Sequence, residues 1–467
     1  MAKSEPAEQT TSVAGRLESP TGDRAIEVRP ASRFSLYVSF DAAPPEDGTE
    51  FAALTLEIAA ATHRLGSCQF VANGAGTVKR GPHGRLIFLE DVYDVESLVL
   101  RNKFVDIDAS FRNLPLVLQQ KEGIRDEFKR LTDDVTYDFG VYRQFFDSED
   151  RKYVDEPADV RAGAQRALIR TVGRQFLAYF QESVDRLDEL VVEYSREEHQ
   201  RHGFYFRNHT WQFIMLSALM ARTNLKPRGY IGDSEMLAML YENDYRGDWV
   251  FPKLLHKYPV ETTASQAVRN RRQIIPAELQ RVRDRLGPQP FRFLSVACGG
   301  AVEVVDLIRG SEDPAGLAVS LLDQDTHALG EAGAGVVAVA EERHFEPSVT
   351  CLNESVRTML RGKSLAERWG TFHCIYSMGL FDYLTPPVAR VVTRRLFDLV
   401  EPGGEVIIGN YHVSNPTRYY MEYWLDWVLY YRTEEEMMQL AADLDGVEAD
   451  LFRDDSGVQM FLRLRKR

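Results

Sequence analysis

The 467-residue sequence has no uninterrupted apolar run of the length, about 18 residues, that a membrane-spanning helix needs. Its first 24 residues are polar and contain no apolar core of a secretory signal. These absences favour a protein that stays in the cytoplasm, without a membrane span. They also predict a disordered tail over residues 1–24.

Cysteine is scarce and widely spaced. The four cysteines are Cys68, Cys298, Cys351 and Cys374, and no pair has the spacing of a metal-binding or redox motif. We therefore expect buried free thiols in a reducing compartment, and no metal site.

The sequence also lacks an excess of basic charge. It has 56 Lys and Arg against 70 Asp and Glu, a net charge of −14, which argues against a partner that is a nucleic acid polymer. With 44% hydrophobic and 27% charged residues, the composition is that of a globular protein. The length predicts several domains.

Residues 25–118 predict a small β-barrel, because short apolar runs alternate with turn residues. Arg29 and Arg33 stand four residues apart ahead of one predicted strand. They resemble the RxxxR motif of PilZ domains, which bind a cyclic dinucleotide through such a pair. The family's second motif is not matched at residues 57–62, so we expect a PilZ-like barrel and favour one that binds no nucleotide. A cyclic dinucleotide stays open as a partner.

Residues 119–220 predict a helical connector, since apolar residues from Leu168 to Val191 recur at i, i+4 and i+7. Residues 221–290 begin with a loop that contains Pro227, Gly229 and Gly232, and Asp233 can cap the helix that follows. We expect this loop and its helices to cover a cofactor.

Residues 291–467 predict a doubly wound α/β sheet of the Rossmann-like kind, with ligands at the carboxyl ends of its strands. The predicted strands are 293–297, 318–322, 336–340, 372–376, 405–409 and 457–464. The predicted helices are 302–309, 326–332, 354–362, 386–399 and 418–431.

A glycine turn ends the first of these strands, and Asp323 ends the second. Glycines let the backbone approach a ligand, and a carboxylate at a strand end can accept both hydroxyls of a nucleoside ribose. The turn has no third glycine of the GxGxxG pattern, which disfavours a nicotinamide cofactor.

The features at successive strand ends resemble those of class I S-adenosylmethionine-dependent methyltransferases. A Pro402-Gly403-Gly404 turn before the fifth strand matches a frequent companion of that family. The resemblance implies S-adenosyl-L-methionine as cofactor. The residues that we expect around it are Tyr230, Asp233, Ala297, Cys298, Gly299, Gly300, Asp323, Gln324, Asp325, Asn353, Glu354, Ser377, Met378 and Gly379.

A narrower resemblance runs from about residue 205 to the C-terminus. Segments such as KPRGYIGDSEML, SVACGGAVEV and SMGLFDYL are similar to the family of proteins for biosynthesis of the extracellular factor 3-hydroxypalmitic acid methyl ester. This resemblance implies O-methylation of a fatty-acid-like carboxylate. The alternatives are N-, S- or hydroxyl O-methylation of another small metabolite, or a nucleotide-sensing regulatory protein whose methyltransferase fold is inactive.

The chemistry of the acceptor decides whether a general base is needed. A carboxylate is already ionised at neutral pH, whereas a hydroxyl or an ammonium must lose a proton. Candidate bases are His412, Tyr383, Asp382 and Tyr411, with His412 preferred because it follows the fifth predicted strand and histidine is the side chain best suited to proton transfer at neutral pH. Candidates for acceptor binding are Arg269, Arg271, Phe381, Asn410, Tyr420 and Trp424. The sequence leaves open whether the barrel packs on its own catalytic domain or forms a homodimer.

Overall fold

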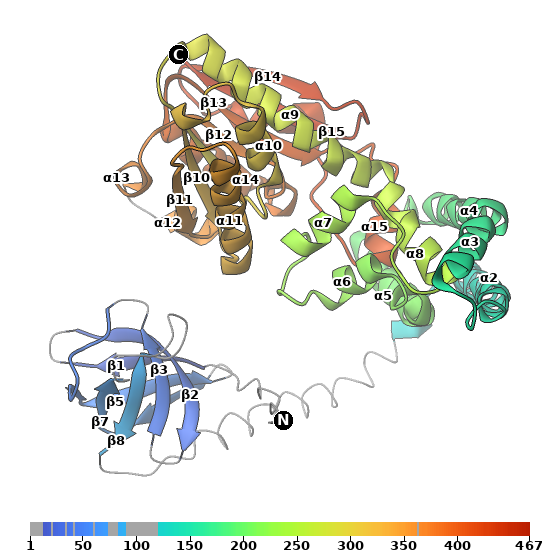
Figure 1. Cartoon of the computed structure of the whole chain (residues 1–467), viewed down its shortest axis with the longest axis horizontal. Helices are drawn as coiled ribbons and strands as arrows, with labels where there is room; N and C mark the ends of the chain where they lie inside the picture. Colours follow the sequence, from blue (N-terminus) through green and yellow to red (C-terminus); the bar gives the residue numbers. More distant parts are fainter. Residues whose placement is uncertain are drawn as a thin grey trace. The chain divides into compact units, whose positions relative to one another are not determined.

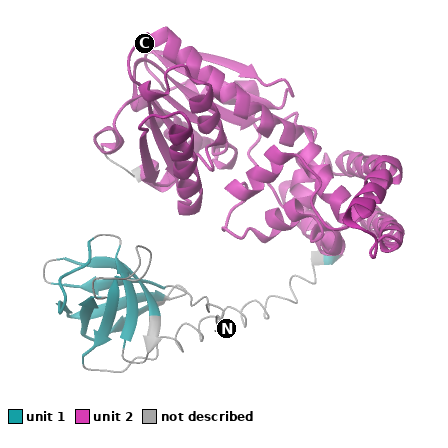
Figure 2. Cartoon of the chain, viewed as in Figure 1, with its two compact units in different colours: residues 1–121 teal, residues 122–467 magenta. Residues whose placement is uncertain are grey.

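The computed structural model describes residues 13–19, 22–32, 35–40, 43–58, 61–72, 83–89, 120–361 and 364–467. The chain forms two compact units, residues 1–121 and residues 122–467 (Figure 2). None of the helices in the described ranges is both long and apolar enough to cross a bilayer.

The first unit is one antiparallel sheet that curls on itself. Its strands are β1 (Val13–Glu18), β2 (Arg24–Ser32), β3 (Ser35–Phe40), β4 (Glu50–Phe51), β5 (Ala53–Ile58), β6 (Ala61–Leu65), β7 (Cys68–Ala72) and β8 (Gly84–Phe88), in the order β4-β7-β8-β3-β2-β1-β5-β6. Ala52 alone separates β4 from β5 in the chain. In the sheet, however, β4 is at one end of the strand order and β5 is next to the strand at the other end. The Ala52 N–H donates to Glu18 O at 3.1 Å, which holds the sheet curled at this point.

Two sequence predictions bear on this unit. Residues 13–18, expected within the disordered tail, form β1, because Val13 and Leu17 alternate with exposed residues and bury their side chains in the sheet's interior. Of the two arginines that resemble the PilZ motif, Arg29 lies in β2, and Arg33 lies outside the described residues.

The second unit begins with a run of helices. They are α2 (Asp126–Arg151), α3 (Ala158–Leu168), α4 (Arg174–Val191), α5 (Arg196–Ile214), α6 (Ala218–Leu225), α7 (Ser234–Glu242), α8 (Val250–Glu261) and α9 (Thr263–Leu286). One hydrophobic core joins α2, α4, α5, α6 and α8 to α15 (Arg418–Trp424), a helix from near the C-terminus (Figure 1). Trp424 of α15 is 1% exposed and lies 5.4 Å from Phe139 and 4.9 Å from Phe206, centroid to centroid. The helices are therefore not a separate connector, since the sheet's own chain supplies part of their core.

The seven-stranded sheet follows these helices. Its strands are β9 (Phe291–Val296), β10 (Leu317–Asp323), β11 (Ser348–Asn353), β12 (Phe372–Ser377), β13 (Val400–Tyr411), β14 (Val447–Arg453) and β15 (Gln459–Lys466), in the order β11-β10-β9-β12-β13-β15-β14. β15 runs antiparallel to both of its neighbours, whereas the other pairs from β11 to β13 are parallel. The order reverses at β9, so a crevice is expected between the carboxyl ends of β10, β9 and β12.

The helices around this sheet are α10 (Val302–Gly310), α11 (Thr326–Glu342), α12 (Val356–Arg361), α13 (Leu365–Trp369), α14 (Pro386–Asp398) and α16 (Glu434–Met438). The strand predicted at 336–340 is wrong, because these residues continue α11. Val336, Val339 and Ala340 are buried at helical spacing on one face. The third strand is instead Ser348–Asn353. The helix predicted over 418–431 ends at Trp424.

Candidate active site

A cavity of about 370 Å³ lies at the carboxyl ends of β9, β10 and β12, where the strand order reverses. This volume is in the range of pockets that bind small molecules. The loop between α6 and α7, together with α7 and α9, supplies further walls. The site is thus built from segments that precede β9 in the sequence and from segments that follow it.

The turn after β9 holds Asp323 in place. Ala297, Gly299 and Ala301 have positive φ values of 54°, 53° and 46°. In this conformation the Gly299 N–H donates to Asp323 Oδ2 at 2.9 Å, and the Asp325 N–H donates to Oδ1 at 2.9 Å. Burial raises the pKa of Asp323. Each oxygen keeps a lone pair for a ligand hydroxyl, so the carboxylate is oriented and still able to accept.

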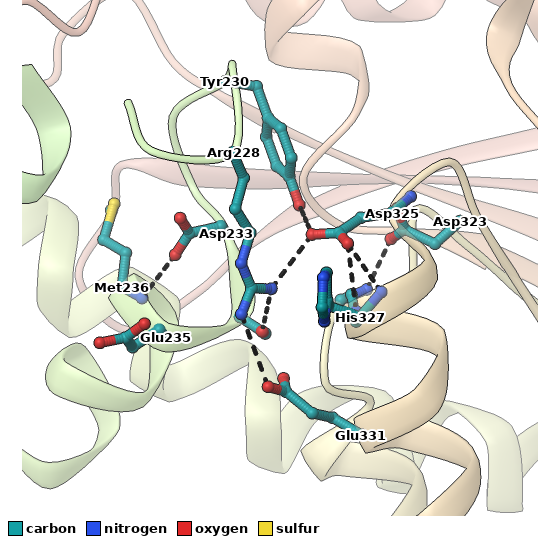
Figure 3. Close-up of polar contacts among 12 residues, drawn as sticks. Arg228, Tyr230, Asp233, Glu235, Met236, Asp323, Asp325, His327 and Glu331 are labelled. Carbon is teal, nitrogen blue, oxygen red and sulfur yellow. Dashed lines mark hydrogen bonds and ion pairs between the residues drawn. The ribbon is translucent and has the colours of Figure 1, made fainter. Parts of the chain in front are cut away.

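The roof loop, residues 226–233, is hydrogen-bonded to the start of α11. The Tyr230 hydroxyl donates to Asp325 Oδ2 at 2.8 Å, and Arg228 NH1 donates to the same oxygen at 3.1 Å (Figure 3). Gly229 and Gly232 supply the positive φ values, 81° and 90°, that the loop needs. Asp325 also caps α11 by accepting the N–H of His327 at 2.8 Å. The roof loop is therefore fixed next to Asp323.

A second contact fixes the roof loop on the other side of the cavity. The Tyr383 hydroxyl donates to Ile231 O at 3.0 Å and accepts from Trp427 Nε1 at 2.8 Å. All three residues line the cavity. Burial raises the pKa of Tyr383 far above neutrality, so its hydroxyl acts as a donor and not as a base.

Asp382 is a buried carboxyl group in the cavity wall. It is 3% exposed, and its Oδ1 accepts the Tyr411 N–H at 2.8 Å. Burial raises the pKa of Asp382 to about 6, against the opposing effects of that hydrogen bond, Arg271 and Arg432. Arg432 braces the segment around Asp382, since it donates to Phe381 O at 2.8 Å and to Leu384 O at 2.6 Å.

Arg271 and Glu303 also line the cavity. Arg271 NH1 donates to Met378 O at 2.7 Å, and the Tyr376 hydroxyl donates to Glu303 Oε1 at 2.8 Å. Burial raises the pKa of Glu303. The sequence predictions missed Glu303, although an acid two residues into the helix after the glycine turn is a visible signal.

More than half of the predicted site residues line the cavity. They are Tyr230, Ala297, Cys298, Gly299, Asp323, Gln324, Glu354, Met378, Gly379, Arg271, Asp382, Tyr383 and Tyr411. The other predicted site residues do not line the cavity. They are Asp233, Gly300, Asp325, Asn353, Ser377, Arg269, Phe381, Asn410, Tyr420, Trp424 and His412.

Three predicted cofactor residues instead support the backbone of the site. Asp233 caps α7 by accepting the Met236 N–H at 2.9 Å, and it pairs with Arg222 at 2.8 Å. Asn353 Nδ2 donates to Asp323 O at 3.1 Å. The Ser377 hydroxyl donates to Val296 O at 3.0 Å. The polar atoms of these three side chains are thus used in hydrogen bonds and an ion pair within the protein.

His412 lies outside the cavity, which corrects our preferred choice of base. Its Nδ1 lies 2.6 Å from Ser414 Oγ, and its Nε2 lies 3.2 Å from Glu434 and 3.0 Å from Arg453. Tyr411 lines the cavity, but its hydroxyl donates to Ala264 O at 2.8 Å, and burial raises its pKa far above neutrality. Neither residue is placed to take a proton from an acceptor.

The predicted acceptor-binding residues are mostly structural. Arg269 NH1 donates to Val260 O at 2.6 Å and to Leu240 O at 3.1 Å, which joins three helices. Phe381, Asn410, Tyr420 and Trp424 are each at most 1% exposed and belong to the interior. The aromatic side chains of α15 therefore form core and no acceptor wall.

The sequence predictions also missed cavity residues that come from distant segments. Tyr241, Tyr376, Trp427 and Leu429 are the clearest cases. Tyr376 is the one with a usable signal, because it is the last residue of the strand predicted at 372–376. The others reach the site only through the packing of the helices, which no local pattern encodes.

No protein-family model matches the chain, and no curated protein matches its sequence. Among solved structures, it is similar to magnesium protoporphyrin IX methyltransferase from Synechocystis PCC 6803 with bound S-adenosylmethionine. The identity is 12% and the TM-score 0.32, over 44% of this chain and 83% of that chain. It is also similar to the N-methyltransferase NodS from Bradyrhizobium japonicum WM9 with S-adenosylhomocysteine, at 12% identity and a TM-score of 0.30, over 42% and 86% of the two chains.

A further solved structure is a possible exported protein from Bordetella parapertussis, at 16% identity and a TM-score of 0.40, over 50% of this chain and 79% of that chain. TM-scores of 0.30 to 0.40 are too low to carry an argument about function.

Proposed function

We propose that the chain is an S-adenosylmethionine-dependent methyltransferase that acts on a small molecule. The observation that carries the proposal is the cavity at the reversal of strand order, with the glycine turn on one side and the Asp323 carboxylate on the other. The seventh strand of this sheet in the chain, β15, lies antiparallel between the fifth, β13, and the sixth, β14, and this order supports the resemblance to class I methyltransferases. The dinucleotide-binding order lacks that antiparallel strand.

The residues present fit such a cofactor. Asp323 is held by two backbone N–H groups and keeps lone pairs for two ribose hydroxyls. Beside it, Gln324, Glu354, Val356 and Met359 form a wall of mixed polar and apolar groups suited to a purine. When bound, S-adenosylmethionine supplies an electrophilic methyl group on a sulfonium.

The charge of the cavity fits a cation. Among the described residues that line it, four are acidic (Glu303, Asp323, Glu354 and Asp382) and one is basic (Arg271). Burial raises the pKa of Glu303, Asp323 and Asp382, which means that their ionised forms are disfavoured in the empty cavity. A positively charged ligand would stabilise these ionised forms. A net positive sulfonium cofactor meets this requirement.

The protein's remaining task is to exclude water and to orient the acceptor. The roof loop covers the cavity through its bonds to Asp325 and Tyr383. The wall near Asp382 is apolar, with Leu380, Leu384, Trp427 and Leu429. This wall supports the narrower proposal, drawn from the sequence resemblance, that the acceptor is the carboxylate of a fatty-acid-like molecule. Such a carboxylate needs no proton acceptor.

A second class of acceptor is favoured by Asp382. A carboxyl group with a pKa of about 6 in the cavity wall is suited to take a proton from a hydroxyl or an ammonium at neutral pH. The two classes differ in their pH dependence. With a proton-bearing acceptor, the rate of methyl transfer falls as the pH drops below about 6, because Asp382 becomes protonated. Asp382→Asn then abolishes most of the methyl transfer. With a carboxylate acceptor, that substitution has little effect.

The experiment that tests the proposal is transfer of a labelled methyl group from S-adenosylmethionine. The full chain is incubated with fatty acids, 3-hydroxy fatty acids, and amines or alcohols of similar size. Label in one acceptor, with Asp323→Ala at least tenfold slower, supports the proposal. Binding of S-adenosylhomocysteine without transfer to any acceptor favours the regulatory alternative, and absence of both contradicts the proposal.

We propose a PilZ-like module for the N-terminal unit. Its curled antiparallel sheet and Arg29 support this reading. Titration with cyclic di-GMP tests whether it binds a nucleotide. Heat that is lost in Arg29→Ala indicates a nucleotide sensor, and no heat indicates a module that binds none.

A further inference from the structure

Three residues line both the cavity and a second, smaller hollow. They are Val268 of α9, Tyr411 at the end of β13 and Trp427 in the segment after α15. These three residues form the floor of the cavity and belong to the hydrophobic core of the helices. The rest of the smaller hollow is lined by residues of that helical region: Leu219, Leu240, Pro259, Thr262, Ala264, Ser265, Met421 and Leu425. The floor therefore lies between the cavity and the helical core.

The side-chain donors of the floor are already used within the protein. The Tyr411 hydroxyl donates to Ala264 O at 2.8 Å, and Trp427 Nε1 donates to the Tyr383 hydroxyl at 2.8 Å. Val268 has no polar side-chain atom and is 2% exposed. A polar group brought against the floor would lose its hydrogen bonds to water and find no donor there, which is costly. The floor therefore favours an apolar part of a ligand.

The smaller hollow also suits an apolar group. Its volume is about 10 Å³, which is room for about one water molecule or one methyl group. The two aliphatic hydroxyl groups in its lining, those of Thr262 and Ser265, both donate to Pro259 O, at 3.0 Å and 2.6 Å. Neither of them is left to donate a hydrogen bond into the hollow. A space with few free polar partners takes an alkyl group more readily than a water molecule.

The floor is remote from the residues that the proposed function assigns to the nucleoside. Asp323 ends β10, and Glu354 directly follows β11. In the strand order, β13 lies on the other side of β9 from these two strands. Tyr411 brings the floor to the end of β13, next to Asp382, whose Oδ1 accepts the Tyr411 N–H at 2.8 Å. The part of the cavity in front of the floor is therefore left for the methyl acceptor.

We propose that the methyl acceptor carries an apolar chain whose end lies against the floor, and that Val268 limits the length of this chain. The proposal rests on the proposed function, and it holds for a carboxylate or an ammonium head, because only the tail of the acceptor meets the floor. Hydrogen bonds fix Tyr411 and Trp427, whereas packing alone holds the Val268 side chain. Shortening Val268 should therefore open the cavity toward the smaller hollow without breaking a hydrogen bond.

The test measures how affinity depends on chain length. Calorimetry on the full chain, saturated with S-adenosylhomocysteine, follows the binding of two straight-chain series, from butanoate to dodecanoate and from butylamine to dodecylamine. In the series that binds, each methylene that becomes buried should raise the affinity about fourfold. The gain should stop at a length limit, where the chain reaches the floor. Val268→Ala should raise this limit by at least one methylene, and Val268→Leu, which lengthens the side chain, should lower it.

The chain offers a matched control in the same helical core. Val184 of α4 is 2% exposed, as Val268 is, and it lines neither the cavity nor the smaller hollow. Val184→Ala should leave the length limit unchanged. Ala264 lines the smaller hollow, so Ala264→Val added to Val268→Ala should fill that space again and restore the wild-type limit. Thermal melting of each variant separates a change in binding from loss of folding.

The outcomes separate this inference from the proposed function. A wild type that does not bind S-adenosylhomocysteine refutes the proposed function. With that binding intact, a wild type that binds neither series, or binds them with no dependence on chain length, overturns the apolar chain. The same length limit in the wild type, Val268→Ala and Val268→Leu overturns the role of Val268. A limit that rises equally in Val184→Ala also overturns that role, because it shows a general loosening of the core.

Discussion

Asp323 is the side chain whose replacement is most informative about the cofactor. Its two oxygens accept the N–H groups of Gly299 and Asp325, each at 2.9 Å, and the residue is 7% exposed. The carboxylate is thus fixed before a ligand arrives, which favours binding because little ordering remains to be done. Asp323→Ala removes both the fixed acceptor and the charge.

The expected loss follows from the bonds that disappear. A hydrogen bond to a buried charged group contributes about 1–3 kcal/mol when its partner is left unsatisfied. This corresponds to a dissociation constant that is roughly 5- to 140-fold higher. The same substitution leaves two backbone N–H groups without their acceptor, so the melting temperature should fall as well. Asp323→Asn, which keeps one acceptor oxygen, should lose less stability than Asp323→Ala.

The assay is calorimetric binding of S-adenosylhomocysteine and of its 2′-deoxy analogue. The wild type should bind the analogue more weakly, and Asp323→Ala should bind both ligands with similar affinity, because the missing hydroxyl no longer has a partner. Asp306→Asn, a change at a surface ion pair, serves as the control. Unchanged affinity in a folded Asp323→Ala variant would refute the placement of the ribose.

Three further predictions concern the roof loop, the preferred base and the aromatic core. Tyr230→Phe removes the hydroxyl that donates to Asp325, so stopped-flow fluorescence should show S-adenosylhomocysteine leaving about 3- to 10-fold faster, and an unchanged rate would contradict the role of this bond. His412→Ala should change the rate of methyl transfer less than twofold, because its ring contacts Glu434 and not the cavity, and a large rate loss with an intact melting curve would contradict this. Trp424→Ala should lower the free energy of unfolding by about 3–5 kcal/mol in a denaturant titration, since the side chain is 1% exposed, and a loss below about 1 kcal/mol would show that it is not core.

The alternation of strands and helices in the C-terminal half was readable from the sequence, because its central strands are short, continuous apolar runs. β12 is buried at every position and was predicted within one residue. β14 was missed, since Val447–Arg453 alternates apolar and charged residues at the edge of the sheet. The error at 336–340 arose because valines and alanines at helical spacing also resemble a strand core.

The glycine turn and Asp323 were predictable as parts of a site, since strand ends gather at one edge of a parallel sheet. The failures have two physical causes. First, polar side chains such as Asp233 and Asn353 are close in sequence to residues that line the cavity, but they form hydrogen bonds with the backbone instead of facing a ligand. Second, Trp427 reaches the cavity only because α15 packs within the helical core, and such packing between distant segments leaves no pattern in the local sequence.

The central claim is that the cavity at the strand reversal binds S-adenosylmethionine. Titration of the full chain with S-adenosylhomocysteine tests it most directly. We predict one ligand per chain, with micromolar affinity that Asp323→Ala weakens at least fivefold. Absence of binding at millimolar ligand, or binding that Asp323→Ala leaves unchanged, would contradict the claim.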